Sequence, residues 1–88
     1  MIFITLYRFK RKPTKDSVAK AGKLLDQTVK EGAKIIGMYW TLGRYDAVII
    51  TERKDEKSAM KALLRLGDMA STETLVAVPR EEAIKLIE

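Results

Sequence analysis

Four short stretches of the chain are rich in β-branched, aromatic and other apolar residues, which is typical of strands, and the segments between them have helical periodicity. The expected strands cover residues 2–9, 34–41, 46–53 and 72–78. In the first intervening segment, Val18, Leu25 and Val29 recur at helical spacing, with lysines mostly on the other side. The pattern therefore predicts the order β-α-β-β-α-β, followed by a short terminal helix.

Start and stop signals place the ends of the helices. Thr14 and Asp55 are suitable N-caps for the two main helices, and Gly32 and Gly67 stand where those helices should end. Gly22 lies inside the first helix, where glycine costs about 1 kcal/mol relative to alanine, so we expect it to allow close approach to the sheet. The three helices are predicted from Thr14 to about Glu31, from Asp55 to Leu66, and over residues 80–88 after Pro79.

This order of elements is the split βαβ arrangement of the ferredoxin-like fold. We therefore predict one α+β domain over residues 1–88, with a four-stranded antiparallel sheet and both main helices on one of its faces.

The predicted strands are apolar on both faces, although two helices can cover only one. Ile2, Ile4 and Leu6 share one face of the first strand, while Phe3 and Tyr7 share the other. An uncovered apolar face of several hundred Å² is larger than soluble monomers usually expose. We expect a second copy to pack sheet to sheet around a two-fold axis, or within a larger oligomer, the alternative being that the terminal helix folds back over this face.

Composition narrows the possible chemistry. The chain has no cysteine and no histidine, so thiolate and imidazole groups are unavailable, and we expect neither a metal site nor a cofactor. Few amide side chains accompany many Lys, Arg and Glu residues, which is typical of heat-adapted proteins. An apolar-then-basic N-terminus and the lack of an apolar run of about 20 residues favour a cytoplasmic protein with no membrane partner.

The most distinctive stretch is Tyr39–Val48, YWTLGRYDAV. Together with the ITLYRF start and the later STETLVAV, it resembles the GYD-domain family, whose name-giving residues correspond to Gly43, Tyr45 and Asp46. The resemblance runs from Ile4 to about Ile84. It implies a ferredoxin-like subunit of the dimeric α/β-barrel type, and it brings no established activity with it.

This hairpin has a structural and a functional interpretation. In the structural one, Gly43 supplies a positive φ, and Asp46 accepts backbone N–H bonds or pairs with Arg44. In the functional one, the hairpin forms the mouth of a ligand pocket between sheet and helices, and Asp46 with Tyr45 are the candidate catalytic residues. The candidate ligand-binding residues are Tyr39, Trp40, Thr41, Gly43, Arg44, Tyr45 and Asp46.

We therefore expect a small oligomeric module for ligand binding, sensing or assembly, and an enzyme is the less favoured interpretation. The first alternative is a cofactor-independent monooxygenase or isomerase of the dimeric α/β-barrel type. A further alternative is nucleic-acid binding through the basic run Arg8–Lys12. Nucleic acid is an unlikely partner by this pattern, because the third strand has no aromatic residue on which bases would stack. Glu73 is expected near a sheet edge, paired with a cation.

Overall fold

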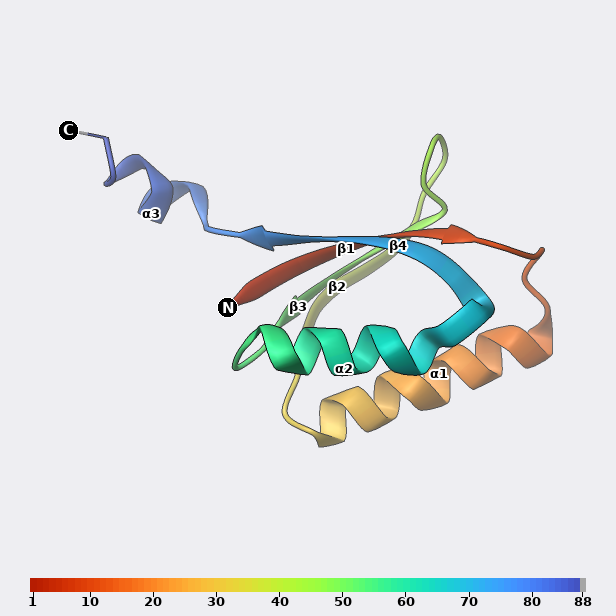
Figure 1. The fold of residues 1–88 in the computed structure, drawn as a ribbon. Helices are drawn as coiled ribbons and strands as arrows, with labels where there is room; N and C mark the ends of the chain where they lie inside the picture. The colour runs from red at the N-terminus through yellow and green to blue at the C-terminus, as the bar shows by residue number, and fades with distance from the viewer. Residues whose placement is uncertain (88) are drawn as a thin grey trace.

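The computed structural model describes residues 1–87 as a twisted four-stranded sheet with two helices packed below one face (Figure 1). Its strands are antiparallel and lie in the order β2-β3-β1-β4. In chain order the elements are β1 (Ile2–Phe9), α1 (Lys15–Lys30), β2 (Lys34–Trp40), β3 (Ala47–Glu52), α2 (Glu56–Leu66), the 3₁₀ turn η1 (Gly67–Met69), β4 (Ala70–Ala77) and α3 (Arg80–Ile84). The predicted α+β, ferredoxin-like fold is confirmed.

Side-chain caps fix the starts of both main helices. The Thr14 hydroxyl accepts a hydrogen bond from the Ser17 backbone N–H at 3.1 Å, and the Ser17 hydroxyl accepts one from the Thr14 N–H at 2.8 Å. The Asp55 carboxylate likewise accepts a hydrogen bond from the Ser58 N–H at 3.0 Å. Each cap satisfies a backbone donor that the helix itself leaves unpaired. The two predicted N-caps are therefore confirmed.

Several strand ends differ from the expected ones by a single residue, and two boundaries differ by more. β4 begins at Ala70, two residues before the predicted start, because Ala70 pairs with Phe9 directly after the η1 turn. α3 ends at Ile84, before the predicted end of the terminal helix, and residue 88 lies outside the described part of the chain. Neither difference changes the order of the elements.

The helices cover the face of β1 that carries its aromatic residues. Phe3 is only 2% exposed and Thr5 only 8%, and across the ladder Thr51 is 3% exposed. The other buried apolar residues are small, namely Ala33, Ala47, Ala59 and Ala70. The helix-facing side of the sheet therefore presents threonines and alanines at several central positions.

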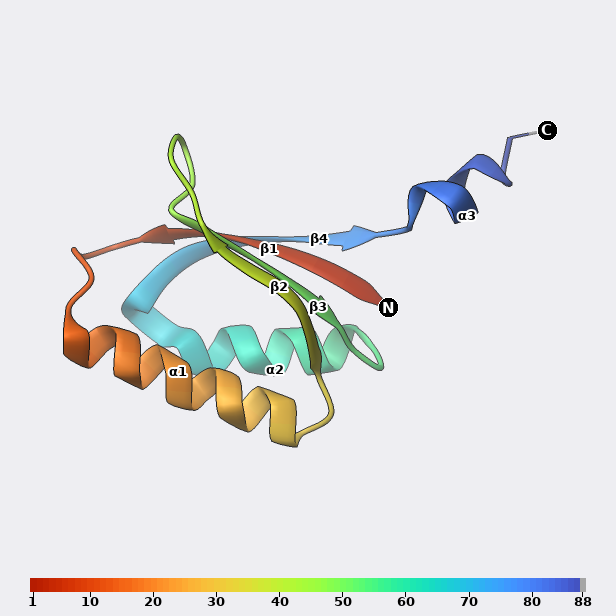
Figure 2. The ribbon, with the colours of Figure 1, turned by 180° about the vertical axis from the view of Figure 1, so that it is seen from behind.

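We call the opposite side of the sheet the open face, defined by Ile2, Ile4, Leu6, Val48, Ile50 and Leu75. These residues alternate with the buried ones along their strands, and Leu75 is 44% exposed. Figure 2 shows no helix over this face, and α3 continues beyond the end of β4, away from the sheet. The terminal helix therefore leaves the open face uncovered within the chain.

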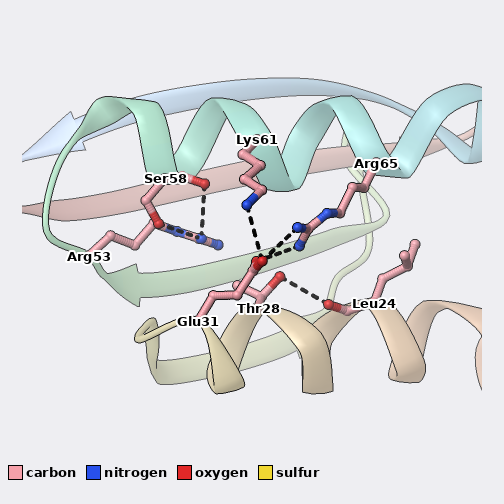
Figure 3. Close-up of polar contacts among 7 residues, drawn as sticks. All are labelled: Leu24, Thr28, Glu31, Arg53, Ser58, Lys61 and Arg65. Atoms are coloured by element: carbon pink, nitrogen blue, oxygen red, sulfur yellow. Dashed lines mark hydrogen bonds and ion pairs between the residues drawn. The ribbon is translucent and has the colours of Figure 1, made fainter.

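An ionic cluster joins the two main helices at one end (Figure 3). The Glu31 carboxylate accepts hydrogen bonds from both terminal nitrogens of Arg65, one of them at 2.7 Å, and lies 3.2 Å from Lys61 Nζ. These contacts lower the pKa of Glu31 to about 2, chiefly through the hydrogen bond from Arg65. The end of α1 is thereby tied to α2 rather than to the sheet.

Candidate binding cavity

A cavity of about 800 Å³ lies between the sheet and the two main helices. Thr5, Tyr7 and Ile49 contribute to its sheet side, and Leu24 and Leu63 come from α1 and α2. Pockets of about 300–1,000 Å³ lined mostly by apolar groups are the usual size for small-molecule sites. The cavity is therefore large enough for a small organic ligand.

Small residues keep this space open. Ala21 and Gly22 border it from α1, and Ala59 and Ala62 border it from α2. A Cβ added to Gly22 would meet no atom within 4 Å. The expected close approach of Gly22 to the sheet is therefore wrong, since this glycine faces open space.

Tyr7 and Arg53 border the cavity, and neither forms an ion pair in the described residues. The Tyr7 side chain is half-buried, and its hydroxyl makes no hydrogen bond to another side chain within residues 1–87. Burial raises the pKa of the Tyr7 phenol, and the positive charge of Arg53 acts against this increase. Burial also lowers the pKa of Arg53, while the nearby Tyr7 opposes that change. The two groups therefore lie close enough to affect each other's ionisation.

Arg53 is held in place by neutral groups. Its Nε–H donates to the Thr51 hydroxyl at 3.1 Å, and Nη1 lies 3.4 Å from the backbone oxygen of Ser58 and 3.5 Å from its hydroxyl (Figure 3). No carboxylate in the described residues forms an ion pair with it. The cavity thus has a half-buried cation on its boundary.

Further charges around the cavity are mainly positive. Arg11, Lys12, Lys20 and Arg65 also border it, against the single acidic residue Asp68. Arg65 is neutralised by Glu31, as described above. The remaining charges around the cavity are mainly positive, so they attract anions and repel cations.

The YWTLGRYD hairpin projects from the side of the sheet opposite the helices (Figures 1 and 2). The Asp46 carboxylate accepts a hydrogen bond from the Phe9 N–H at 2.7 Å, and the Asp46 N–H donates to the Tyr7 carbonyl at 2.8 Å. The Thr41 N–H donates to the Asp46 carbonyl at 2.8 Å. Asp46 therefore closes the hairpin and joins it to the end of β1.

Tyr45 connects the same hairpin to β4. Its hydroxyl donates to the Glu73 carboxylate at 2.6 Å, and this hydrogen bond is the main reason why the pKa of Tyr45 is raised. The Arg44 guanidinium lies 5.6 Å from the Tyr45 ring centre, within the range of a cation–π contact. Thr41 adds a hydrogen bond from its hydroxyl to the Tyr45 carbonyl at 2.7 Å. These residues contact each other and the sheet end, rather than the cavity.

Only Trp40 among the candidate site residues borders the cavity. Its ring makes an edge-to-face contact with Phe9, with the ring centres 5.5 Å apart. Tyr39 is 58% exposed on the opposite face, where its ring lies over Gly37. The two neighbouring aromatics thus point to opposite faces, as strand geometry predicts. Gly43 has a φ of +107°, which confirms its expected place in the turn.

Sequence reasoning did not assign Tyr7 and Arg53 to the site. Tyr7 lies on the same face of β1 as Phe3 and Phe9. This position indicates the cavity only when that face is known to meet the helices. Arg53 follows β3 immediately, and nothing in its local pattern distinguishes it from the other arginines.

The described part of the chain offers neither a metal site nor a membrane-spanning helix. Within residues 1–87, no cluster of three or more acidic residues is placed to hold a metal ion. No helix in the same range is long and apolar enough to cross a membrane.

Comparison with known proteins identifies the family and the fold. The model of the GYD domain matches residues 3–87, while a search of curated proteins finds no match. Solved structures with the same fold include FFRP-DM1, at 17% identity and a TM-score of 0.59 over 88% of this chain and 97% of that one. A dimeric ferredoxin-like protein of unknown function from Thermobifida fusca has 17% identity and a TM-score of 0.58 over 88% and 89% of the two chains. The hypothetical protein PHS023 from Pyrococcus horikoshii has 15% identity and a TM-score of 0.54 over 93% and 95%.

Proposed function

The chain belongs to the GYD domain family, and from this premise we propose that it is a binding module that holds a small, mainly apolar molecule between its helices and its sheet. The single observation that carries the proposal is the cavity of about 800 Å³ at this position. The space is partly open to solvent, because exposed side chains such as Lys20 and Trp40 border it, so its apolar lining stays in contact with water unless a ligand covers it. A bound ligand would bury the apolar lining.

Gly22 offers a test that leaves the fold in place. Leucine has a much higher helix propensity than glycine, so Gly22→Leu should not weaken α1. Its side chain would enter the open space that Gly22 faces and compete with a ligand. Trp40 is the only tryptophan of the sequence, and it borders the cavity although it is 67% exposed, so its fluorescence reports a ligand that contacts this part of the lining.

We expect 1-octanol, a neutral apolar probe, to change the fluorescence of Trp40 and to give a saturable heat in calorimetry. Gly22→Leu should weaken this binding at least tenfold while the melting temperature stays the same or rises. Gly22→Ala is the matched control, since its single methyl group occupies less of the cavity. The proposal is refuted if octanol fails to bind, or if Gly22→Leu binds it as tightly as the unmodified chain.

Our second proposal is that two copies pack through their open faces. Its support is the apolar character of this face, which no helix within residues 1–87 covers. Burying several hundred Å² at about 25 cal/mol per Å² would contribute on the order of 10 kcal/mol before the costs of association. The similar protein from Thermobifida fusca is described as dimeric, which supports self-association.

The test places a charge at the centre of the open face. Ile4 pairs with Ile50 on one side and with Leu75 on the other, so Ile4→Glu would bury a carboxylate in the proposed contact. Sedimentation should then change from a dimer to a monomer. Leu64→Glu, at a position 76% exposed on α2, should leave the dimer intact. A monomeric unmodified chain at micromolar concentration would contradict the proposal.

In this proposal the hairpin belongs to the edge of the subunit contact, since it projects on the side of the open face. Asp46 and Tyr45 then serve to fix the hairpin rather than to catalyse a reaction, because both side chains already bond to the neighbouring strands. A role for the seven hairpin residues in ligand binding stays a prediction, as does the cytoplasmic location.

A further inference from the structure

The geometry points to a ligand with an apolar body and one carboxylate, which Arg53 binds at its end of the cavity. This inference rests on the proposed binding function and specifies its ligand class. It starts from an arginine that is half-buried, borders an apolar cavity and has no acidic partner in the described residues.

The hydrogen bonds that Arg53 makes leave some of its N–H groups free to bind an anion. A guanidinium has five N–H groups. One from Nε points to the Thr51 hydroxyl, and one from Nη1 points to Ser58. Both N–H groups of Nη2 make no hydrogen bond in the described residues, so they remain available to the oxygens of a carboxylate.

Burial makes this unpaired charge costly without an anion. Removing a cation from water is unfavourable unless an opposite charge or hydrogen bonds compensate. Neutral oxygens from Thr51 and Ser58 provide part of that compensation, and the lowered pKa of Arg53 has burial as its main cause. A ligand carboxylate would supply the missing negative charge.

Arg53 is a better carboxylate site than the other free cations around the cavity. Arg11, Lys12 and Lys20 are exposed, and water and salt therefore screen their charges. Arg53 is also held in one orientation by two neighbours, which reduces the entropy lost when it binds an anion. The exposed cations add to the positive field that attracts the acid, but they do not fix its position.

Tyr7 supplies a second polar contact inside the cavity. Its hydroxyl makes no side-chain hydrogen bond and lies close enough to Arg53 to feel its charge. Because Tyr7 also borders the cavity, its hydroxyl can donate a hydrogen bond to a polar group of the ligand. The apolar body of the ligand would lie against the leucines and small residues of α1 and α2.

Three probes with the same eight-carbon chain test this inference: octanoate, 1-octanol and octylamine. We expect calorimetry and Trp40 fluorescence to show octanoate binding about tenfold or more tightly than octanol, and octylamine most weakly. Arg53→Gln should remove the preference for octanoate and leave the affinity for octanol within twofold. Arg11→Gln, which removes an exposed cation from the same cavity, should reduce octanoate affinity by twofold or less.

The outcomes separate this inference from the proposed function. If octanol and octanoate bind equally well, or if Arg11→Gln removes the preference as completely as Arg53→Gln does, the assignment to Arg53 is wrong and the cavity remains a binding site. If no probe binds, the proposed function fails, and this inference fails with it. Should Arg53→Gln not fold, Arg53→Lys replaces it. Lysine keeps the charge but lacks the planar donor geometry of the guanidinium. We therefore expect Arg53→Lys to bind octanoate several-fold more weakly and octanol with unchanged affinity. An unchanged affinity for octanoate would overturn the assignment to Arg53.

Discussion

Asp46→Ala should destabilise the folded chain by removing the link between the hairpin and β1. The carboxylate accepts the Phe9 N–H at 2.7 Å, at the place where the pairing of β1 with β3 ends. Alanine provides no acceptor, so the Phe9 N–H would depend on water for its hydrogen bond. The backbone bonds of Asp46 to Tyr7 and Thr41 do not require its side chain and would persist.

The magnitude follows from the type of hydrogen bond. Bonds to charged groups contribute about 1.5–3 kcal/mol, and we take the lower end because Asp46 is only half-buried. A loss of about 1.5 kcal/mol in a domain of this size lowers the melting temperature by roughly 6–12 °C. Asp46→Asn keeps one side-chain oxygen as an acceptor without the negative charge, and should lose about half as much.

Circular dichroism during thermal and urea unfolding measures this loss of stability. The chain concentration is kept fixed, because association would otherwise shift the unfolding midpoint. Asp26→Ala is the control, because Asp26 is exposed on α1 and has no ion pair in the described residues. Our reasoning would be refuted if Asp46→Ala were as stable as Asp26→Ala. Octanol affinity should be the same in both variants, since Asp46 does not border the cavity.

Three further predictions concern the helix ends and the turn. The pKa of Glu31 is lowered in the folded chain, from 4.5 to about 2. The ionised carboxylate therefore stabilises the fold fully above pH 4.5, and this effect disappears as the pH falls towards 2. Glu31→Gln should lower the melting temperature at pH 7 and have little effect on it near pH 2. Gly43→Ala should cost about 1–3 kcal/mol in urea unfolding through its φ of +107° alone, since the added Cβ meets no atom within 4 Å, and an unchanged midpoint would contradict this. Thr14→Ala should cost about 1 kcal/mol in the same measurement, whereas Thr14→Ser, which keeps the capping hydroxyl, should cost much less.

The sequence predicts the order and the ends of the elements well, because these depend on local chemistry. Thr14 and Asp55 cap helices in any context that allows a helix to form, and the positive φ of Gly43 follows from the tight turn. The start of β4 was less predictable, since Ala70 is a strand residue only through its pairing with Phe9, 61 positions earlier in the chain.

The position of the cavity depends on information that the pattern does not contain. Both faces of β1 are apolar, so periodicity alone does not reveal that Phe3 and Tyr7, rather than Ile4 and Leu6, meet the helices. The more aliphatic face of the sheet is the open face, contrary to the simple expectation that the most hydrophobic face packs in the core of the chain. Arg53 becomes notable only after the fold brings it beside Tyr7.

The residues that carry the family resemblance and the residues that border the cavity are almost entirely different. Asp46 and Tyr45 bond to β1 and β4, and Gly43 allows the turn, so the shared hairpin determines how one end of the sheet is closed. Arg53 and Tyr7 lie outside this motif, and their side chains, rather than the motif, would select a ligand. Relatives with the same hairpin but another residue at the position of Arg53 should therefore keep this fold and lose the preference for a carboxylate. Membership of the GYD domain family therefore does not by itself specify a ligand for this chain.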